Sequence, residues 1–87
     1  MQFEHDSTKS RANKVKHGID FEQAKELWQD DDRIEIPARS DTEQRNAIIA
    51  RFLGKVWIGF FTMRGDSCRI ISVRRARTNE QIHYYER

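Results

Sequence analysis

The 87-residue chain lacks the features that mark secreted and membrane proteins. Its one cysteine, Cys68, cannot form an intramolecular disulfide, so the chain is not a disulfide-stapled secreted protein, and we expect it in the cytoplasm. The first residues lack the basic start and apolar run of a signal peptide. The longest apolar stretch, Val56 to Phe61, is too short to span a bilayer, so we expect no membrane partner.

The sequence also has little that would bind a metal or a nucleotide cofactor. His5, His17 and His83 show no ligand-pair spacing with one another or with the cysteine, and none of the four glycines forms a phosphate loop. We therefore expect neither a metal nor a cofactor. With 37% hydrophobic residues, the chain is long enough for one domain, 1–87, whose active site would be a surface groove.

Charge of either sign is plentiful but unevenly distributed. Counted along the sequence, residues 1–18 carry a net +2, residues 19–44 a net −6 and residues 45–87 a net +6. Such asymmetry is typical of a surface that binds a polyanion. A solvated surface of mixed sign explains the same counts, and charge alone favours that simpler interpretation.

Two N-terminal helices are predicted after a short extended piece at Phe3. Asp6 or Ser7 can cap the first helix, which runs to about Lys16 and ends at Gly18. A capping-box pattern at positions 20 and 23 predicts a second helix from about 21 to 29. The three aspartates that follow end this helix, because their charges oppose the helix dipole.

The second half of the chain is predicted to be an antiparallel meander closed by a helix. A short strand at Ile34 and Ile36 meets Pro37, which restricts the strand to a sheet edge or ends it. Strands at about 45–53, 56–64 and 68–74 follow, with tight turns at Gly54-Lys55 and Gly65-Asp66. The fold class is therefore α+β: β-α-α, then an antiparallel β meander of three to four strands and a C-terminal helix. A capping-box pattern of Thr78 with Gln81 is expected to start that helix, which would have Ile82 and Tyr85 on one side. The central strands are expected to be apolar on both faces, through Ile48, Ile49, Trp57, Ile58, Phe60, Phe61, Ile70 and Ile71.

Residues 64–77 contain five arginines and a single acid. Ser72 and Arg74 share one face of their strand, and only a turn separates Arg64 from that strand, so we predict that guanidinium groups converge at one rim of the sheet. Arginine forks match phosphate oxygens. Pairing of these arginines with the acids of residues 19–44 is an equally good interpretation at this point.

Three other residues, His17, Trp28 and Trp57, each have a chemical and a structural interpretation. His17 is a candidate general base or phosphate ligand, but a histidine before a helix-ending glycine more often caps the last carbonyls. Trp28 and Trp57 could stack on bases, but aromatic residues in apolar periodic segments are more often core. Cys68, on a strand, is expected to be inert packing.

Two blocks of the sequence resemble the BrnT toxins of bacterial type II toxin-antitoxin systems. They are Lys16-His17-Gly18-Ile19 with Phe21-Glu22 and Ala24, and Arg69-Ile70-Ile71-Ser72 with Arg74 and Ala76. Further similar positions are Phe3-Glu4, Asp6, Lys9, Asn13, Glu43, Arg45, Thr62 and Arg64-Gly65-Asp66. The resemblance implies a compact RelE-like fold and a ribonuclease that works without a metal. It also implies inhibition by a partner antitoxin, BrnA, that carries a ribbon-helix-helix DNA-binding part.

Metal-free RNA cleavage uses the neighbouring 2′-hydroxyl as nucleophile, so the protein must move protons and offset charge on the phosphorus. We assign Arg64 and Arg74 to the phosphate in the transition state and Ser72 to a hydrogen bond on the same face. The proton acceptor stays open among Glu43, His17, Glu80 and Tyr84, with Glu43 placed in the catalytic set. Residues assigned to RNA binding are Lys9, Lys16, His17, Arg69, Arg75, Glu80 and Tyr84; for the two lysines a solvated helix face is an equally good interpretation.

A second hypothesis is a catalytically weak toxin homologue that binds an antitoxin and co-represses their operon. In both cases operator DNA is contacted only through the antitoxin complex. An independent nucleic-acid-binding regulator is disfavoured, because the sequence has no helix-turn-helix and no suitably spaced basic recognition helix.

Overall fold

A five-stranded mixed sheet, in the order β1-β5-β4-β3-β2, forms the centre of the computed structural model, which describes residues 1–39, 41 and 43–86. The α+β class and the predicted order of elements are confirmed. The meander has four strands, and β1 adds a fifth, parallel to β5. The elements are β1 (Gln2–Glu4), α1 (Ser7–His17), α2 (Phe21–Ala24), η1 (Lys25–Gln29, a 3-10 helix), β2 (Ile34–Ala38), β3 (Arg45–Phe52), β4 (Lys55–Arg64), β5 (Ser67–Arg75) and α3 (Thr78–Tyr85).

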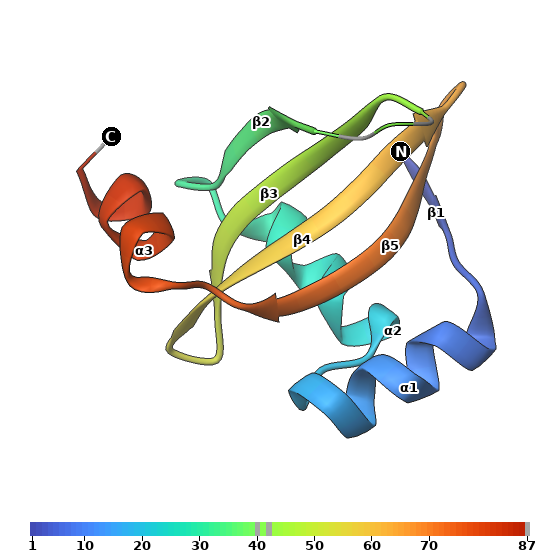
Figure 1. Cartoon of the computed structure of the whole chain (residues 1–87), viewed down its shortest axis with the longest axis horizontal. Helices are drawn as coiled ribbons and strands as arrows, with labels where there is room; N and C mark the ends of the chain where they lie inside the picture. The colour runs from blue at the N-terminus through green and yellow to red at the C-terminus, as the bar shows by residue number, and fades with distance from the viewer. Residues whose placement is uncertain (40, 42, 87) are drawn as a thin grey trace.

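Helices cover the two faces of the sheet unequally. Figure 1 shows α1 and α2 together on one side of the sheet, with α3 apart from them at the other end of the molecule. The larger core cluster lies between the sheet and α2 with η1, and includes Phe21, Leu27 and Trp28. The smaller cluster lies on the opposite face, where Tyr84 of α3 packs near Ile49 and Ile58. The part of the second face that α3 leaves uncovered is where a surface site can form.

Capping signals in the sequence correctly predict the N-terminal helices. The Asp6 carboxylate accepts a hydrogen bond from the Lys9 amide at 3.0 Å, and Gly18 ends α1 with a φ of 81°. Asp20 and Gln23 form the predicted capping box. The second helix covers the predicted span but tightens into the 3-10 segment η1 after four residues.

Asn13 joins α1 to the edge of β5. Its side-chain amide donates to the Val73 carbonyl at 2.9 Å and accepts from the Val73 amide at 3.2 Å. The same amide group donates to the Ile19 carbonyl at 2.7 Å. Because β1 pairs with β5 only as far as Arg69, Asn13 replaces a neighbouring strand at Val73 and satisfies backbone groups that would otherwise be buried without partners.

One detail of the predicted meander is wrong. The β3–β4 turn consists of Leu53 and Gly54, not Gly54-Lys55, because Phe52 pairs with Lys55. Both turn residues have positive φ, 53° and 75°, as a type I′ turn requires, so an exposed leucine occupies a conformation that L-residues disfavour. Pro37 was predicted either to end its strand or to restrict it to a sheet edge. It lies within β2, which is an edge strand, so the second outcome is the one observed.

The C-terminal helix starts at Thr78, as predicted, but its cap and its packing differ from the prediction. Its first capping interaction is a hydrogen bond from the Arg77 amide to the Glu80 carboxylate at 2.7 Å, so Thr78 is not the cap. Ile82 and Tyr85 are exposed, and the buried residue is Tyr84, whose hydroxyl donates to Asp30 Oδ2 at 2.6 Å. The same carboxylate oxygen accepts from the Arg51 amide at 2.8 Å. Asp30 therefore joins the end of η1 to both β3 and α3.

Of the other expected core residues, Trp28 and Trp57 are buried as predicted, whereas Phe60 and Ile71 are only half-buried. In the described part of the chain, no helix combines the length and apolar character needed to cross a membrane.

We expect Asn13→Ala to lower the free energy of unfolding by about 2 to 4 kcal/mol, since it leaves the polar groups of Val73 and Ile19 buried without partners. Chemical denaturation monitored by circular dichroism measures this loss. Gln29→Ala, which removes an exposed amide at the end of η1, is the matched control and should change stability by less than about 0.5 kcal/mol. Equal effects of the two variants would contradict the role assigned to Asn13.

Candidate functional site

A β-bulge in β5 determines which of its side chains share a face. Phe60 pairs with Ser72 and Phe61 with Ile70, so Ile71 is the extra residue of the bulge. The bulge shifts the alternation of β5 by one residue. As a result Ile70 and Val73 both face the helices, and Arg69, which precedes the bulge, lies on the same face as Ser72 and Arg74.

Four arginines lie on the sheet face opposite α1, which we call the arginine face. The strand registers place the side chains of this face in four successive rows. The first row is Ile34, Ile49, Ile58 and Arg74, and the second is Ile36, Ala47, Phe60 and Ser72. The third row is Ala38, Arg45, Thr62 and Arg69, and the fourth is Arg64 and Ser67. The first row lies at the end covered by α3, and the last row lies at the β4–β5 turn. The predicted sharing of a face by Ser72 and Arg74 is confirmed, and the register places Arg64 on the same face.

The predicted convergence of Arg64 and Arg74 at one rim is wrong. Arg74 pairs with Ile58, and Arg64 lies six residues further along β4. At about 3.4 Å per residue their backbones are roughly 20 Å apart, too far for both guanidinium groups to hold one phosphate. The arginine face therefore has two separate cationic regions.

The first region is an ion pair between Arg74 and Glu80 of α3. Arg74 Nη1 and Nη2 donate to the two oxygens of the Glu80 carboxylate at 2.9 and 3.0 Å, and Nη1 also donates to the Arg75 carbonyl at 3.1 Å. These contacts use three of the five guanidinium hydrogens. Within the described residues, the Nε–H and one Nη2–H are left, and they lie on the same edge, which is the geometry that binds two oxygens of a phosphate.

The second region contains Arg45, Arg64 and Arg69 at the far end of the arginine face. Arg69 Nη1 lies 3.5 Å from Glu4 of β1, and Arg45 Nε lies 4.0 Å from Glu43. Both are loose, partly exposed contacts that contribute little to stability. Glu43 thus belongs to this region, away from Ser72 and Arg74, which does not support grouping it with them in one catalytic set.

Ion pairing with the acidic middle of the chain does not account for the arginines of residues 64–77. Within the described residues, their ion pairs are with Glu4 and Glu80, which lie outside residues 19–44. Of the two interpretations, the geometry favours an anion-binding surface over charge pairing with that segment.

Two residues assigned to RNA binding are placed where RNA on the arginine face cannot reach them. Tyr84 is 3% exposed and its hydroxyl donates to Asp30, so the structure does not support it as a proton acceptor. Arg75 projects to the other side of the sheet, where its guanidinium lies 5.6 Å from the centre of the Trp57 ring. The structure supports neither assignment, for reasons of packing that the sequence does not reveal.

The remaining candidates surround a shallow cavity of about 220 Å³ beside α1. Lys9, Lys16 and His17 line one side of it, and Ile71 and Ser72 line the other. The bulge at Ile71 thus lies between the basic face of α1 and the arginine face. The three basic residues of α1 are brought near Ser72, as a shared anion-binding surface requires.

Two side chains of the arginine face that are suited to contact RNA, Phe60 and Arg45, were not among the predicted site residues. Phe60 is half-buried in the middle row, and its ring centre lies 5.8 Å from the Arg74 guanidinium carbon. Arg45 lies next to Thr62, across from Arg69. The sequence could not single out Phe60. Its neighbours, Gly59 and Phe61, are small or apolar too, so this strand lacks the alternation of polar and apolar residues that would show which face Phe60 is on.

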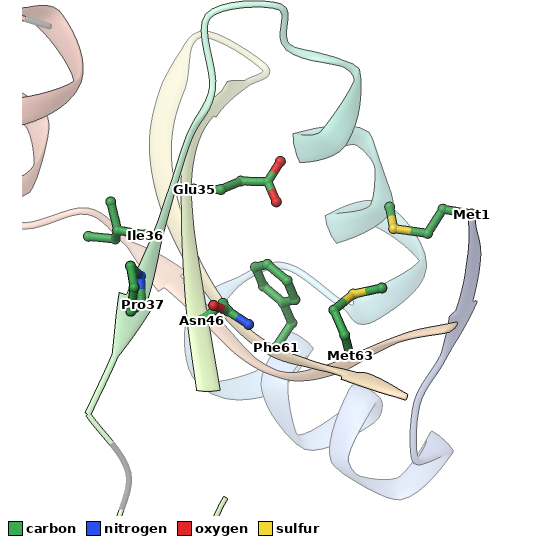
Figure 2. A pocket seen from close by; sticks show the side chains of 7 residues that line it. All are labelled: Met1, Glu35, Ile36, Pro37, Asn46, Phe61 and Met63. Carbon is green, nitrogen blue, oxygen red and sulfur yellow. The ribbon is translucent and has the colours of Figure 1, made fainter. Parts of the chain in front are cut away.

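A separate cavity of about 390 Å³ opens on the helix side of the sheet. Figure 2 shows Glu35, Asn46, Phe61 and two methionines around it, with Ile36 pointing to the opposite side of β2. Most of its lining thus lies on the face opposite the arginine face, and Ile36 of the edge strand β2 lines it as well. The nearby Cys68 is fully buried, and burial, together with the Glu35 charge, raises its pKa to about 12, as expected for an inert packing residue. No group of three or more potential metal ligands is found among the described residues.

The fold and this site define a small α+β domain with an arginine-lined sheet face suited to a polyanion. Residues 5–80 match the family described as ribonuclease toxin, BrnT, of type II toxin-antitoxin system. A comparison with curated proteins gave no match. The chain belongs to the BrnT toxin family, so its activity class is that of a ribonuclease toxin, with RNA as substrate and an antitoxin as partner.

The Arg74–Glu80 pair predicts how stability depends on pH. Hydrogen bonds from the Arg74 guanidinium hold the pKa of Glu80 below its ordinary value of 4.5, against an opposing effect of burial. Because the folded-state pKa is the lower one, the contribution of Glu80 is complete above pH 4.5 and is lost as the pH falls through the folded-state value.

We therefore expect Glu80→Gln to lower the free energy of unfolding by about 1 kcal/mol at neutral pH, with a difference from the parent protein that shrinks in acid. Thermal midpoints of the parent and the variant, measured over a series of acid pH values, give this difference in stability. Glu86→Gln, which changes an exposed carboxylate at the end of α3, should follow the parent at every pH. A parent-to-variant difference that stays constant into acid would rule out this ion pair as its source.

Proposed function

We propose that this chain is an endoribonuclease toxin that cleaves RNA by attack of the 2′-hydroxyl on the adjacent phosphorus, without a metal ion, and thereby inhibits translation and growth. The observation that carries the proposal is the Arg74 guanidinium, which Glu80 holds while its Nε–H and one Nη2–H have no partner among the described residues. Family membership supplies the ribonuclease class. The metal-free course is our proposal, and it rests on this arginine chemistry.

Arg74 is the group best placed to stabilise charge on the reacting phosphate. Its side chain is 23% exposed and is held by Glu80, so binding a phosphate costs little further loss of side-chain freedom. A donor fixed in advance stabilises the extra negative charge of the pentavalent phosphorus. Ser72, one row along the same strand face, can donate a hydrogen bond to a second phosphate oxygen or orient the attacking hydroxyl.

Among the proton acceptors left open by the sequence, we assign His17, which lines a cavity with Ser72. Its imidazole accepts the proton of the 2′-hydroxyl and returns it to the leaving 5′-oxygen. Glu80 is less suited to this role, because its carboxylate already accepts three hydrogen bonds from Arg74 and Arg77, and these bonds lower its pKa and make it a weaker base. Its role is to hold the Arg74 guanidinium.

The remaining cationic side chains are assigned to the RNA backbone. Arg45, Arg64 and Arg69 would hold phosphates on one side of the cleaved bond, and Lys9 and Lys16 would hold phosphates near the α1 cavity. In this proposal the arginines bind successive phosphates of an RNA strand that lies along the arginine face, and they do not all bind one phosphate. Arg64 then contributes to RNA affinity and not to the chemical step.

For the partner, we propose a BrnA-like antitoxin with a ribbon-helix-helix part that covers the arginine face and alone brings the complex to operator DNA. The support is electrostatic, since acidic side chains of a partner complement the arginine face. We further propose that the fold is RelE-like and that the protein acts in the cytoplasm.

Purified protein is expected to cleave RNA in the presence of EDTA and to leave a 2′,3′-cyclic phosphate or its opened product. Arg74→Ala should lower the cleavage rate by about 100- to 1000-fold, and Arg74→Lys by at least about 10-fold, because lysine keeps the charge but loses the two-donor edge. Arg64→Ala should weaken RNA binding about 10-fold or less at low salt. Rates are measured on a labelled oligonucleotide, with thermal midpoints recorded for every variant.

Arg75→Ala is the matched control, since it removes the next guanidinium along β5, on the opposite side of the sheet, and should cleave at the parent rate. Cleavage that EDTA abolishes and magnesium restores would refute the metal-free course. A parent protein that binds its antitoxin but cleaves no RNA would instead establish the alternative, a weak homologue that acts as an antitoxin-binding co-repressor.

The antitoxin is expected to bind over the arginine face and to block RNA cleavage in the complex. Charge reversal by Arg64→Glu with Arg69→Glu should weaken antitoxin binding at least about 10-fold, whereas Arg75→Glu should not. Titration calorimetry measures the affinities, and gel shifts with operator DNA compare the free chain with the complex. A complex that cleaves RNA as fast as the free protein would refute occlusion.

A further inference from the structure

A cavity of about 300 Å³ lies on the arginine face between the sheet and α3, and of the residues that line it only Glu80 has a role in the proposed reaction, as the partner of Arg74. Its floor consists of Ile36, Ile49 and Ile58, one from each of β2, β3 and β4, and its rim consists of Asn79, Glu80 and His83 of α3. We call it the α3 pocket. A flat apolar floor with an amide, a carboxylate and an imidazole at the rim matches the face and edges of a single planar heterocycle.

The α3 pocket is directly connected to the proposed phosphate site. Ile58, on its floor, is the strand partner of Arg74, and Glu80, on its rim, is the carboxylate that holds the Arg74 guanidinium. A nucleotide whose phosphate lies at the free edge of Arg74 would thus have its base within reach of the pocket. The pocket lies on the arginine face, since the strand registers place Ile36, Ile49 and Ile58 there, and Ile36 also lines the edge of the cavity beside Glu35.

Resting on the proposed function, we infer that the α3 pocket binds one nucleobase next to the cleaved phosphate and favours a base that carries an exocyclic amino group. Glu80 Oε2 is an acceptor and accepts one hydrogen bond, from Arg74, among the described residues. An ionised carboxylate binds the N–H donors of adenine, cytosine or guanine, whereas the two carbonyl oxygens of uracil repel it. The Asn79 amide is exposed, has no hydrogen bond within the described residues, and can pair with the adjacent ring nitrogen.

Cleavage of oligonucleotides that differ at one base next to a single cleavable bond tests the inference. We expect the parent protein to prefer an amino-bearing base over uracil at one such position by about 10-fold in kcat/KM, the value of one good hydrogen bond. Asn79→Ala should reduce this preference to below about threefold, and Asn79→Trp, which fills the pocket, should abolish it while leaving Arg74 in place. Ile82→Ala, on an exposed part of the same helix that does not line the pocket, should keep the parent preference.

A binding measurement separates failure of the pocket from failure of the ribonuclease proposal. Adenosine, cytidine and guanosine 5′-monophosphates should shift the Asn79 side-chain amide signals in NMR spectra more than uridine 5′-monophosphate does, whether or not the protein cleaves RNA. Equal shifts with all four nucleotides, or none, would overturn the inference, as would parent-like base preference in Asn79→Trp. If Asn79→Trp instead abolishes antitoxin binding and leaves base preference unchanged, the pocket receives an antitoxin side chain and the inference is wrong.

Discussion

The hydrogen bonds between the Asn13 side chain and the backbone of Val73 fix the part of β5 on which the site depends. Val73 lies just beyond the bulge at Ile71, where β1 has already ended and β5 would have an unpaired edge. A bulged edge strand can shift its register, and a shift of one residue turns every later side chain to the other face. By bonding both polar groups of one residue, Asn13 restricts β5 to the register that places Ser72 and Arg74 on the arginine face.

A second contact fixes the guanidinium itself. The Glu80 carboxylate comes from α3, which is attached to the rest of the molecule mainly through Tyr84 and its hydrogen bond to Asp30. A partly buried ion pair of this kind adds only about 1 kcal/mol to folding stability. Its larger effect is on orientation, because it occupies the end of the guanidinium and leaves the side edge for a phosphate. The position of α3 therefore controls both the direction of Arg74 and the depth of the α3 pocket.

Structural features that depend on residues close together in the sequence could be predicted, whereas features that depend on the packing of distant segments could not. The caps at Asp6, Gly18 and Asp20 are local hydrogen-bonding patterns, so both N-terminal helices were correctly predicted. The bulge at Ile71 has no such pattern, since it is an isoleucine within an apolar run. The distance from Arg64 to Arg74 and the burial of Tyr84 also depend on strand register and helix docking, which no local signal specifies.

The uneven charge of the sequence becomes a spatial separation in the fold. Acidic side chains of the middle segment, such as Glu22, Glu26 and Glu35, belong to α2, to η1 and to the helix-facing side of β2, whereas Arg45, Arg64, Arg69 and Arg74 line the opposite face. A net charge of only +2 thus hides a molecule with one cationic face. Such a distribution orients an approaching polyanion without strong attraction over the whole surface. The same face also offers an acidic partner a complementary surface, so RNA and antitoxin would compete for one set of arginines.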